Sequence, residues 1–297
     1  MRFNLHLPYS LVGAWELWLR PGSLERIATD AQAAGFHSIS ISEHPIPTTE
    51  WLDSGGHHAL DPFVALSFLA AGSTSLRLLT NVLVLPYRSP VLTAKAIASL
   101  DVLSGGRVTV GTAVGYLEPE FAALGVDFHQ RAAAFERAIE EMKMAWASDG
   151  QGGMTGYVMW PPPAQRPHPP LWVGGNSAAA RRRAISLGDG WMPFAQSARM
   201  AAVTGTPAIA TFEDLAAGVA RLGVETRESN RETPLDVCFG VFGRSSLYRE
   251  DASPQEVDNE VQTYAEIGVT WLTVQSRAAS PDDMLQELDR WSPMLSG

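Results

Sequence analysis

The stretch Leu76–Ala113, LRLLTNVLVLPYRSPVLTAKAIASLDVLSGGRVTVGTA, decides the fold. It begins with the almost continuously apolar run Leu76–Leu85, which is typical of a buried parallel strand. A helical stretch, Pro90–Leu103, follows and ends at the pair Gly105-Gly106, because glycine stops helices readily. Arg107–Ala113 then predicts another strand. Strand, helix and strand in this order predict a right-handed parallel unit.

The same alternation of short strands and amphipathic helices continues on both sides of this unit. About eight such units fit the chain, which predicts an α/β fold, a (β/α)8 TIM barrel with insertions, as a single domain over residues 1–297. A doubly wound open sheet is the alternative, but no Gly-x-Gly-x-x-Gly follows the first strand. Three irregular stretches, at about 45–60, 151–170 and 196–233, are expected to be excursions from the barrel.

The expected elements follow directly from the periodicity. The strands are Arg2–Leu7, His37–Ser42, Leu76–Leu85, Arg107–Ala113, Leu171–Val173, Trp191–Phe194, Leu235–Val241 and Thr270–Gln275. The helices are Ser23–Ala34 with Ser23 as N-cap, one starting at Asp61-Pro62, Pro90–Leu103, Ala132–Ala147, Asn176–Leu187, Phe212–Leu222, Ser253–Ile267 and Pro281–Trp291.

Composition limits the class of protein. The chain is 45% hydrophobic and 18% charged, with a single cysteine, so it can bury a large core without disulfides. Its net charge of −10 argues against nucleic acid and anionic membranes as partners. The start, MRFNLHLPYS, has no long apolar segment, so we expect no secretory signal and a cytoplasmic protein.

In such a barrel the chemistry lies at the carboxyl ends of the strands. The second strand ends in Ser42-Glu43-His44, and a histidine there suits proton transfer because it titrates near neutral pH. If the strand continues, Glu43 alternates to the other side and braces rather than reacts. A solvated loop histidine is the simpler interpretation. A metal site is a further alternative, formed by His44, His57, His58 and Asp61.

Two other strand ends indicate a ligand. Gly111–Tyr116 ends the fourth strand with glycines that allow close approach of the backbone. Gly174-Gly175-Asn176-Ser177 lies directly before a helix, where backbone N–H groups bind anions. Asn176 or Ser177 could instead be only a helix cap. The apolar third strand offers a flat wall to an aromatic ligand, although core packing also explains it.

Three remaining features receive plain interpretations. The run Arg181-Arg182-Arg183 is expected to be a solvated helix face. Cys238 lies inside an apolar strand and is expected to be inert core. No Gly-x-Ser-x-Gly elbow is present, which disfavours a serine hydrolase.

Five motifs in order resemble the luciferase-like flavin or deazaflavin oxidoreductases, and most closely the branch that uses coenzyme F420. The resemblance covers about Gly35–Trp191. It is carried by Leu78–Val91 (LLTNVLVLPYRSPV), Leu100–Val110 (LDVLSGGRVTV), Gly111–Gly125 (GTAVGYLEPEFAALG, with Arg131 and Glu136 after it), Leu171–Gly175 (LWVGG) and Gly188–Met192 (GDGWM).

The resemblance implies a TIM barrel and a bulge at the end of the third strand, often with a non-prolyl cis peptide, behind the cofactor ring. It implies that His44 lies near the reactive ring carbon. Some deazaflavin enzymes carry a catalytic glutamate after the fourth strand, but Tyr116 occupies that position here, and the role of Trp51 is open. The implied cofactor-binding residues are Val82, Leu83 and Val84 at the ring, Ala113, Val114, Gly115 and Tyr116 along the ring and ribityl chain, and Gly174, Gly175, Asn176 and Ser177 at the phosphate.

The sequence therefore predicts a coenzyme F420-dependent oxidoreductase that passes a hydride between the deazaflavin ring and a small organic substrate. The alternatives are an FMN-dependent luciferase-like monooxygenase, a metal-dependent hydrolase on the same barrel, and a cofactor-binding barrel without turnover. Family members are commonly dimers, so we expect a homodimer that associates through barrel helices. The substrate itself is not readable from the sequence.

Overall fold

The computed structural model describes residues 1–148 and 153–295. Eight parallel strands close into a barrel in chain order, and β8 pairs back to β1. The predicted (β/α)8 fold is therefore confirmed, and the open doubly wound sheet is wrong. The strands are β1 (Arg2–His6), β2 (Ser38–Ile41), β3 (Arg77–Val84), β4 (Val108–Ala113), β5 (Leu171–Gly174), β6 (Gly190–Met192), β7 (Asp236–Gly240) and β8 (Trp271–Gln275).

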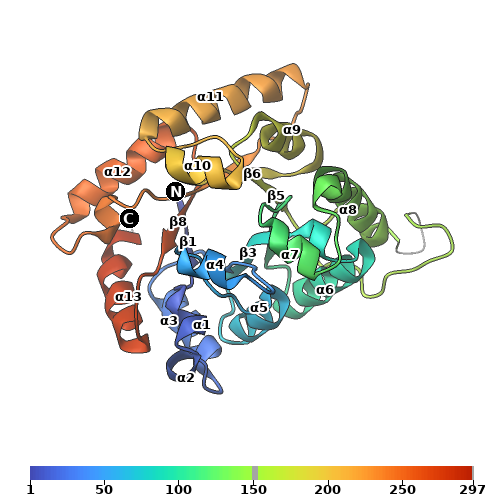
Figure 1. The fold of residues 1–297 in the computed structure, drawn as a ribbon. Helices are drawn as coiled ribbons and strands as arrows, with labels where there is room; N and C mark the ends of the chain where they lie inside the picture. Colours follow the sequence, from blue (N-terminus) through green and yellow to red (C-terminus); the bar gives the residue numbers. More distant parts are fainter. Residues whose placement is uncertain (149–152, 296–297) are drawn as a thin grey trace.

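The long helices surround the strands as a ring in chain order (Figure 1). Their apolar faces pack on the outside of the barrel, as the sequence pattern predicts. They are α3 (Ser23–Ala33), α5 (Pro62–Ala71), α6 (Pro90–Ser104), α8 (Arg131–Trp146), α9 (Ala178–Leu187), α11 (Phe212–Glu228), α12 (Pro254–Glu266) and α13 (Pro281–Leu295).

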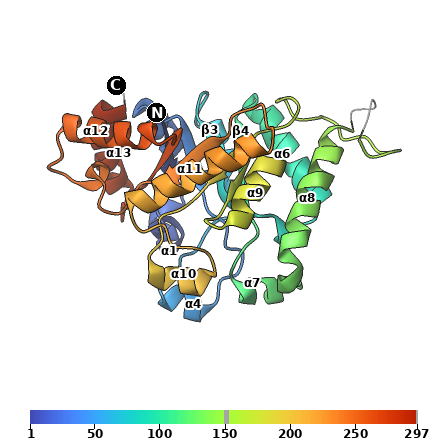
Figure 2. The same cartoon turned by 90° about the horizontal axis from the view of Figure 1, so that it is seen from above.

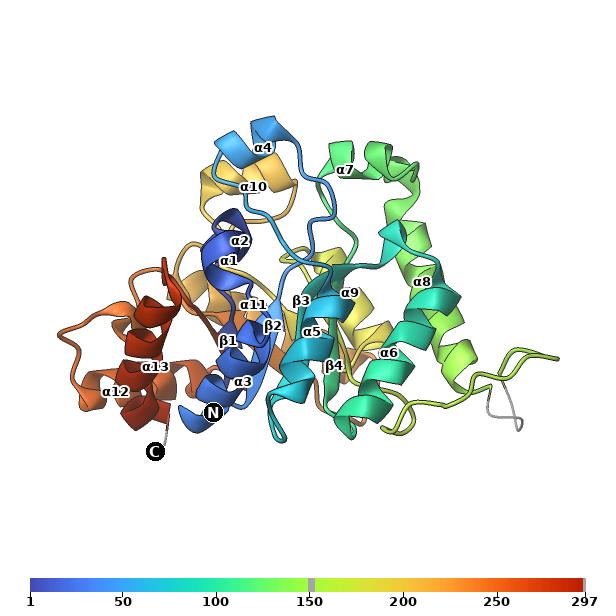
Figure 3. The ribbon, with the colours of Figure 1, turned by 90° about the horizontal axis from the view of Figure 1, so that it is seen from below.

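Short helices gather where the strands end. Figures 2 and 3 show α4, α7 and α10 together at one end of the barrel, the end from which the chain leaves the strands toward the loops. The short elements are α1 (Ser10–Gly13), α2 (Trp15–Trp18), α4 (Thr49–Asp53), α7 (Glu118–Ala123), α10 (Ala198–Thr204), η1 (Leu85–Tyr87), η2 (Phe128–Gln130) and η3 (Ser246–Tyr248).

The irregular stretches contain more structure than the sequence indicates. The stretch 45–60 includes α4, and the stretch 196–233 includes both α10 and α11. The excursion expected at 151–170 begins outside the described residues, and from 153 onward it contains no helix or strand. Helices α4 and α10 have only five and seven residues, so their hydrophobic periodicity is too weak to predict them, whereas α11 is the helix predicted to begin at Phe212.

Two helix starts test the capping argument. Asp61 caps α5 and accepts hydrogen bonds from the backbone N–H of Phe63 and Val64, with Pro62 at the first position as predicted. The prediction that Ser23 is the N-cap of α3 is wrong. Ser23 is the first helical residue, and the N-cap is Gly22, whose φ is 85°. Glycine reaches this left-handed conformation without a steric penalty.

The inside of the barrel is partly polar. The Asn4 amide donates to the hydroxyls of Ser40 and Thr273 at 2.7 and 3.1 Å, so the serine face of β2 points inward. Ile39 and Ile41, on the opposite face, join the core beneath the helices. The alternation of β2 therefore separates a polar interior from an apolar outer layer.

No described helix is both long enough and apolar enough to pass through a lipid bilayer.

Candidate functional site

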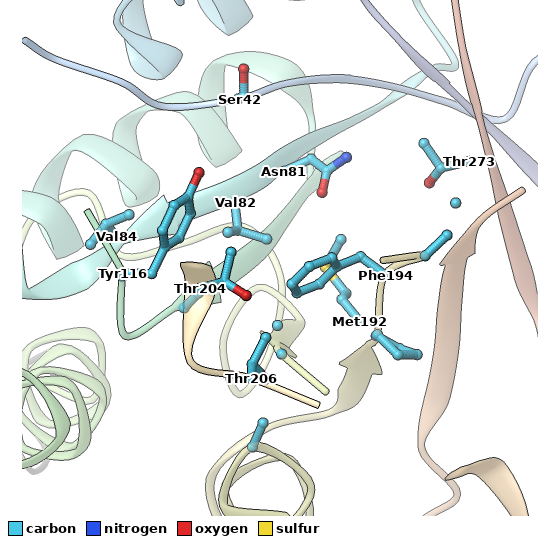
Figure 4. Close-up of a pocket in the computed structure, with 18 of the residues that line it drawn as sticks. Ser42, Asn81, Val82, Val84, Tyr116, Met192, Phe194, Thr204, Thr206 and Thr273 are labelled. Carbon is cyan, nitrogen blue, oxygen red and sulfur yellow. The ribbon is translucent and has the colours of Figure 1, made fainter. Parts of the chain in front are cut away.

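A cavity of about 780 Å³ opens at the carboxyl ends of the strands, under α4, α7 and α10. All eight strands contribute to its wall, either through their last residues or through the residues that follow them. Figure 4 shows the labelled side chains surrounding one space, among them Val82, Tyr116, Met192 and Phe194. The volume suits a cofactor-sized ligand.

One wall comes from the irregular end of β3. The pairing of β3 with β4 shifts register between Thr80 and Leu83, and the Asn81–Val82 peptide is cis, which confirms the bulge that the resemblance implies. Val82 and Val84 line the cavity. Leu83 does not, which corrects its assignment, because alternation turns its fully buried side chain into the core.

The segment after β4 lies against this wall. Ala113, Val114, Gly115 and Tyr116 all line the cavity. Gly115 has a φ of 81°, and a Cβ there would come within 2.7 Å of the Val84 side chain. Only glycine therefore allows the two segments to approach this closely.

Glu43 holds the bulge in place from behind. Its carboxylate accepts from the Val84 backbone N–H at 2.6 Å and from Arg88 Nε at 2.8 Å. Burial raises the pKa of Glu43, while Arg88 and the Val84 N–H oppose that shift. Arg88 also binds Asp61, so one guanidinium bridges two carboxylates behind the bulge.

The loop between β5 and α9 forms the end of the cavity next to the segment after β4. Gly174, Gly175 and Ser177 line it, and Ser177 caps α9 by accepting from Ala180 N. The remaining N–H groups of the first turn have no carbonyl partner within the helix, which is the usual setting for an anion. Gly175 has a φ of 121°, and a Cβ there would meet the Ala180 Cβ at 3.1 Å.

Asn176 does not line the cavity, which corrects its assignment as a phosphate ligand. Its amide group donates to the carbonyls of Phe194 and Pro207 and accepts from the Phe194 N–H. It therefore fastens the loop after β6 to the loop after β5. A polar side chain directly before the N-cap of a helix is typical of a phosphate ligand, and the sequence therefore suggests that role for Asn176. In the folded chain its hydrogen-bond partners are backbone groups of distant segments.

Two arginines lie at the same end. Arg183 lines the cavity and binds Glu136 at 2.7 Å. Arg131 lines it too, lies 3.8 Å from the Phe128 ring centroid, and has a buried Nε without a hydrogen-bond partner. Arg181 is buried and paired with Glu225, so the prediction of a solvated Arg181–Arg183 face holds only for Arg182.

His44 lies on the cavity wall after β2, and its side chain is only 11% exposed. Its Nδ1 donates to Glu120 Oε2 at 3.1 Å. The rings of Trp51 and His57 pack against it, with centroids 4.3 and 4.9 Å away. Because Nδ1 is bound to a carboxylate, Nε2 is the nitrogen that remains for a ligand.

Glu120, on α7, is the site residue that sequence reasoning missed. It is almost fully buried, and its carboxylate also accepts from the Tyr87 hydroxyl at 3.1 Å and the Ile46 N–H at 3.2 Å. Burial and this carboxylate raise the pKa of Tyr87. The one available signal was an acidic pair, Glu118 and Glu120, shortly after the fourth strand.

His57 completes an aromatic corner. Its Nε2 lies 3.1 Å from the Ser42 hydroxyl, and its ring stacks on Tyr9 at 3.6 Å. Burial, with smaller contributions from neighbouring histidines, lowers its pKa to about 3, so the ring is neutral at physiological pH. Trp51, whose role the sequence left open, packs against both histidines.

The residues of the metal alternative have other partners. His57 is bound to Ser42, and Asp61 is bound to Arg88 and to the first turn of α5. Within residues 1–148 and 153–295, no group of three or more histidine, cysteine, aspartate or glutamate side chains is arranged to hold a metal ion.

The cavity floor is closed by residues of the last strands. Cys238 and Thr273 line it, with their side-chain atoms 3.4 Å apart. Burial raises the pKa of Cys238 to about 12, so it remains a thiol. The expectation of an inert cysteine fits this setting, although its side chain reaches the cavity floor rather than the outer core.

A parallel barrel with an apolar bulge at β3 and an anion-type loop at β5 has the architecture of a flavin or deazaflavin enzyme. The family model for luciferase-like monooxygenases matches residues 6–228. The chain therefore belongs to the luciferase-like monooxygenase family, whose members are oxidoreductases and monooxygenases.

Individual relatives differ in cofactor. An FMNH2-dependent dimethylsulfone monooxygenase of Pseudomonas putida is 33% identical over 130 residues, which cover 41% of this chain and 36% of that protein. The chain thus spans about a third of that relative. A monooxygenase of Streptomyces bottropensis superposes with a TM-score of 0.76 at 20% identity, covering 99% and 98% of the two chains. A coenzyme F420-dependent tetrahydromethanopterin reductase of Methanopyrus kandleri superposes with a TM-score of 0.68 at 15% sequence identity, and the superposition again covers 99% and 98% of the two chains. These structures share the fold.

Proposed function

We propose that this protein is a coenzyme F420-dependent oxidoreductase acting on a small organic substrate. The observation that carries the proposal is that the apolar bulge at Val82 and Val84 and the loop Gly174–Ser177 lie next to each other on the wall of one cavity. When bound, the deazaflavin ring of the cofactor takes up or delivers a hydride. The protein supplies the surrounding geometry and the proton chemistry.

The residues present fit such a group. Val82 and Val84 give a flat apolar surface for a ring, and Gly115 leaves space beside it. The first turn of α9 suits a phosphate. Arg131 and Arg183 lie at the same end. Coenzyme F420 bears carboxylates beyond its phosphate, whereas FMN ends at its phosphate, so these two cations favour coenzyme F420.

His44 is the residue proposed to transfer the proton. Glu120 holds its Nδ1, so the ring is fixed and Nε2 is available to a substrate atom in the cavity. A carboxylate behind a histidine fixes its tautomer and stabilises its protonated form. His44 can therefore give or take a proton at Nε2 as the hydride moves.

The decisive test is titration of the purified protein with coenzyme F420 and with FMN, followed by absorbance. We expect tighter binding of coenzyme F420, weakened at least about tenfold in an Arg131→Gln, Arg183→Gln double variant, because each charged contact contributes over 1 kcal/mol. FMN affinity should change less. Arg137→Gln is the control, since Arg137 is on the same helix as Arg131 but is exposed and pairs with Glu141. If the wild type binds FMN more tightly than coenzyme F420, the cofactor is FMN and the proposal is wrong.

The FMN-dependent monooxygenase is the second candidate function. It is favoured by the Pseudomonas putida relative, which uses reduced FMN. The same loop and bulge would hold FMN. Oxygen consumption with reduced FMN, absent with reduced coenzyme F420, would support this candidate.

We also propose a homodimer that associates through α5 and α6. Val64 and Phe68 on α5 and Leu92 and Leu103 on α6 are exposed, the last two by 72% and 82%. These two helices are neighbours, and an exposed apolar patch of this kind usually marks an interface. Light scattering should give the mass of a dimer, and a Leu92→Glu, Leu103→Glu variant should give the mass of a monomer. A monomeric wild type would remove the proposal.

A further inference from the structure

The cavity has a second charged end, which the cofactor proposal does not use. In a closed barrel of eight strands, β8 and β1 lie opposite β4 and β5. Arg277 follows β8 and Tyr9 follows β1, and both line the cavity. Arg277 therefore lies across the cavity from the loop Gly174–Ser177.

Arg277 is held in one orientation. Its guanidinium carbon lies 3.7 Å from the Tyr248 ring centroid, and Nη2 donates to the Gly243 carbonyl at 3.1 Å. The Tyr248 hydroxyl is itself fixed by accepting from the Gln275 N–H at 2.9 Å. Glu287 accepts from the backbone N–H of Arg277 and does not reach its guanidinium.

Within residues 1–148 and 153–295, three arginines line the cavity, and they differ in their partners. Arg183 binds Glu136, whereas Arg131, at the end proposed for the cofactor, donates to the Phe128 carbonyl and has no carboxylate partner in these ranges. Among the described residues, Arg277 forms no side-chain ion pair, and only one of its five N–H groups has a partner. It is an exposed cation on the cavity wall, held by the Gly243 carbonyl and the Tyr248 ring, whose other N–H groups have no partner in the described part of the chain.

The surface beside Arg277 is aromatic. Tyr9 stacks on His57 and meets His6 edge to face at 5.6 Å. Tyr9 is 46% exposed, and its phenol is uncharged at physiological pH because the ordinary pKa of tyrosine is about 10. The stacked His57 in turn packs against His44. The contacting rings thus run from Tyr9 through His57 to the proposed proton-transfer residue, and Tyr9 and Arg277 both line the cavity.

We propose that this wall is the substrate subsite and that the substrate is an organic oxyanion, a carboxylate or sulfonate, with an apolar body. The anionic group binds Arg277, and the body lies along Tyr9 toward His44. A guanidinium binds such groups through paired charge-assisted hydrogen bonds. The proposal rests on the proposed function for the placement of the cofactor at the opposite end.

The test uses probes that differ only in charge: 2-naphthoate, 2-naphthalenesulfonate and the neutral 2-naphthamide. Binding is measured by calorimetry on the protein with and without coenzyme F420. We expect the wild type to bind an anionic probe at least about tenfold more tightly than naphthamide. The stronger of the two anions identifies the acid class. In Arg277→Gln the preference should fall below about twofold while naphthamide affinity is kept.

The matched control is Arg244→Gln, because Arg244 is an exposed arginine on the neighbouring loop after β7, next to Gly243, and does not line the cavity. A wild type that binds no probe or shows no preference for the anion overturns the proposal. So does a preference that survives in Arg277→Gln or disappears in Arg131→Gln, since the latter places the probe at the cofactor end. Cofactor affinity, measured in the same samples, distinguishes the proposed function from the proposed subsite. If the wild type binds the anionic probes through Arg277 but does not bind coenzyme F420, the proposed function is wrong and the subsite stands.

Discussion

The two halves of the cavity wall carry different chemistry. In the described part of the chain, every imidazole and carboxylate that lines the cavity comes from the segments after β1 to β4, namely Glu43, His44 and His57. The segments after β5 to β8 contribute the anion-type loop, other small and aromatic side chains, and the cations Arg183 and Arg277, while the third cation, Arg131, follows β4. The first half therefore holds all the imidazoles and carboxylates of the described wall, and the second holds the loop and two of the wall's three cations.

The length of the connections explains this division. Between β5 and α9 only residues 175–177 intervene, so backbone N–H groups dominate there. Between β2 and α5 the chain runs from 42 to 61 and includes α4, which brings several side chains over the cavity. Short connections therefore present backbone, and long ones present side chains.

The largest expected effect comes from a substitution in the first half of the cavity wall, the segments after β1 to β4. His44→Ala should lower turnover about 10²–10⁴-fold, because it removes the group proposed to transfer a proton, while cofactor affinity stays nearly unchanged. Steady-state kinetics and a cofactor titration of the same preparation measure the two quantities. The control is His129→Ala, which changes an exposed histidine outside the cavity.

A second variant decides between proton transfer and hydrogen bonding at the same position. His44→Asn keeps a hydrogen-bonding group but cannot carry a proton near neutral pH. We expect it to be as slow as His44→Ala. Near-normal turnover in His44→Asn would mean that His44 only holds the cofactor or the loop.

The next effect concerns stability at low pH, and it is also located in the first half. Burial lowers the pKa of His6 to about 4 and that of His57 to about 3. Below the unfolded value of about 6.5 the unfolded chain binds protons that the folded chain does not, so stability falls as pH falls. Between pH 6.5 and pH 4, each of these two histidines lowers the free energy of unfolding by about 3 kcal/mol.

Urea unfolding at pH 6.5 and pH 4.5 measures this loss. His57→Gln should reduce the difference in unfolding free energy between the two pH values by about 2–3 kcal/mol. His129→Gln should leave it unchanged, since that residue is exposed. An unchanged difference in His57→Gln would show that His57 is not held neutral in the folded state.

Much of this comparison could be predicted from the sequence. The strands, the helices and the loop Gly174–Ser177 follow from local patterns, since hydrophobic periodicity and a glycine pair before a helix act within a few residues. His44 was found because it directly follows a strand. These features need no knowledge of which strands meet across the barrel.

The remaining features depend on contacts between distant segments. Glu120 is 76 residues from His44, and no local pattern joins them. Leu83 and Asn176 were assigned to the site, but the bulge and the loop after β6 turn them away from the cavity. Arg277 lies opposite the anion loop only because the barrel closes. Such relations arise from tertiary packing and are absent from the pattern of the chain.

A smaller effect sharpens the role of the pair His44 and Glu120. Glu120→Gln keeps the shape of the side chain but replaces the carboxylate that holds Nδ1. We expect turnover to fall about tenfold, because the amide no longer holds the Nδ1–H of His44 as firmly as a carboxylate and Nε2 is then less well oriented. Glu118→Gln, on the same helix but exposed, is the control. Wild-type turnover in Glu120→Gln would mean that Glu120 acts only through packing.

The smallest effect tests the second half at its anion loop. Gly175→Val places a branched side chain at a φ of 121° and 3.1 Å from the Ala180 Cβ, so the loop must shift and its N–H groups leave their positions. We expect cofactor affinity to fall about tenfold, or about 1.4 kcal/mol. Gly268→Val is the matched control, because Gly268 also has a positive φ, of 96°, but does not line the cavity. Both variants lose stability through backbone strain, and only Gly175→Val should lose affinity. If the cofactor affinity of Gly175→Val stays within about twofold of the wild type, or about 0.4 kcal/mol, the phosphate binds elsewhere. The loop Gly174–Ser177 would then have no part in binding the cofactor.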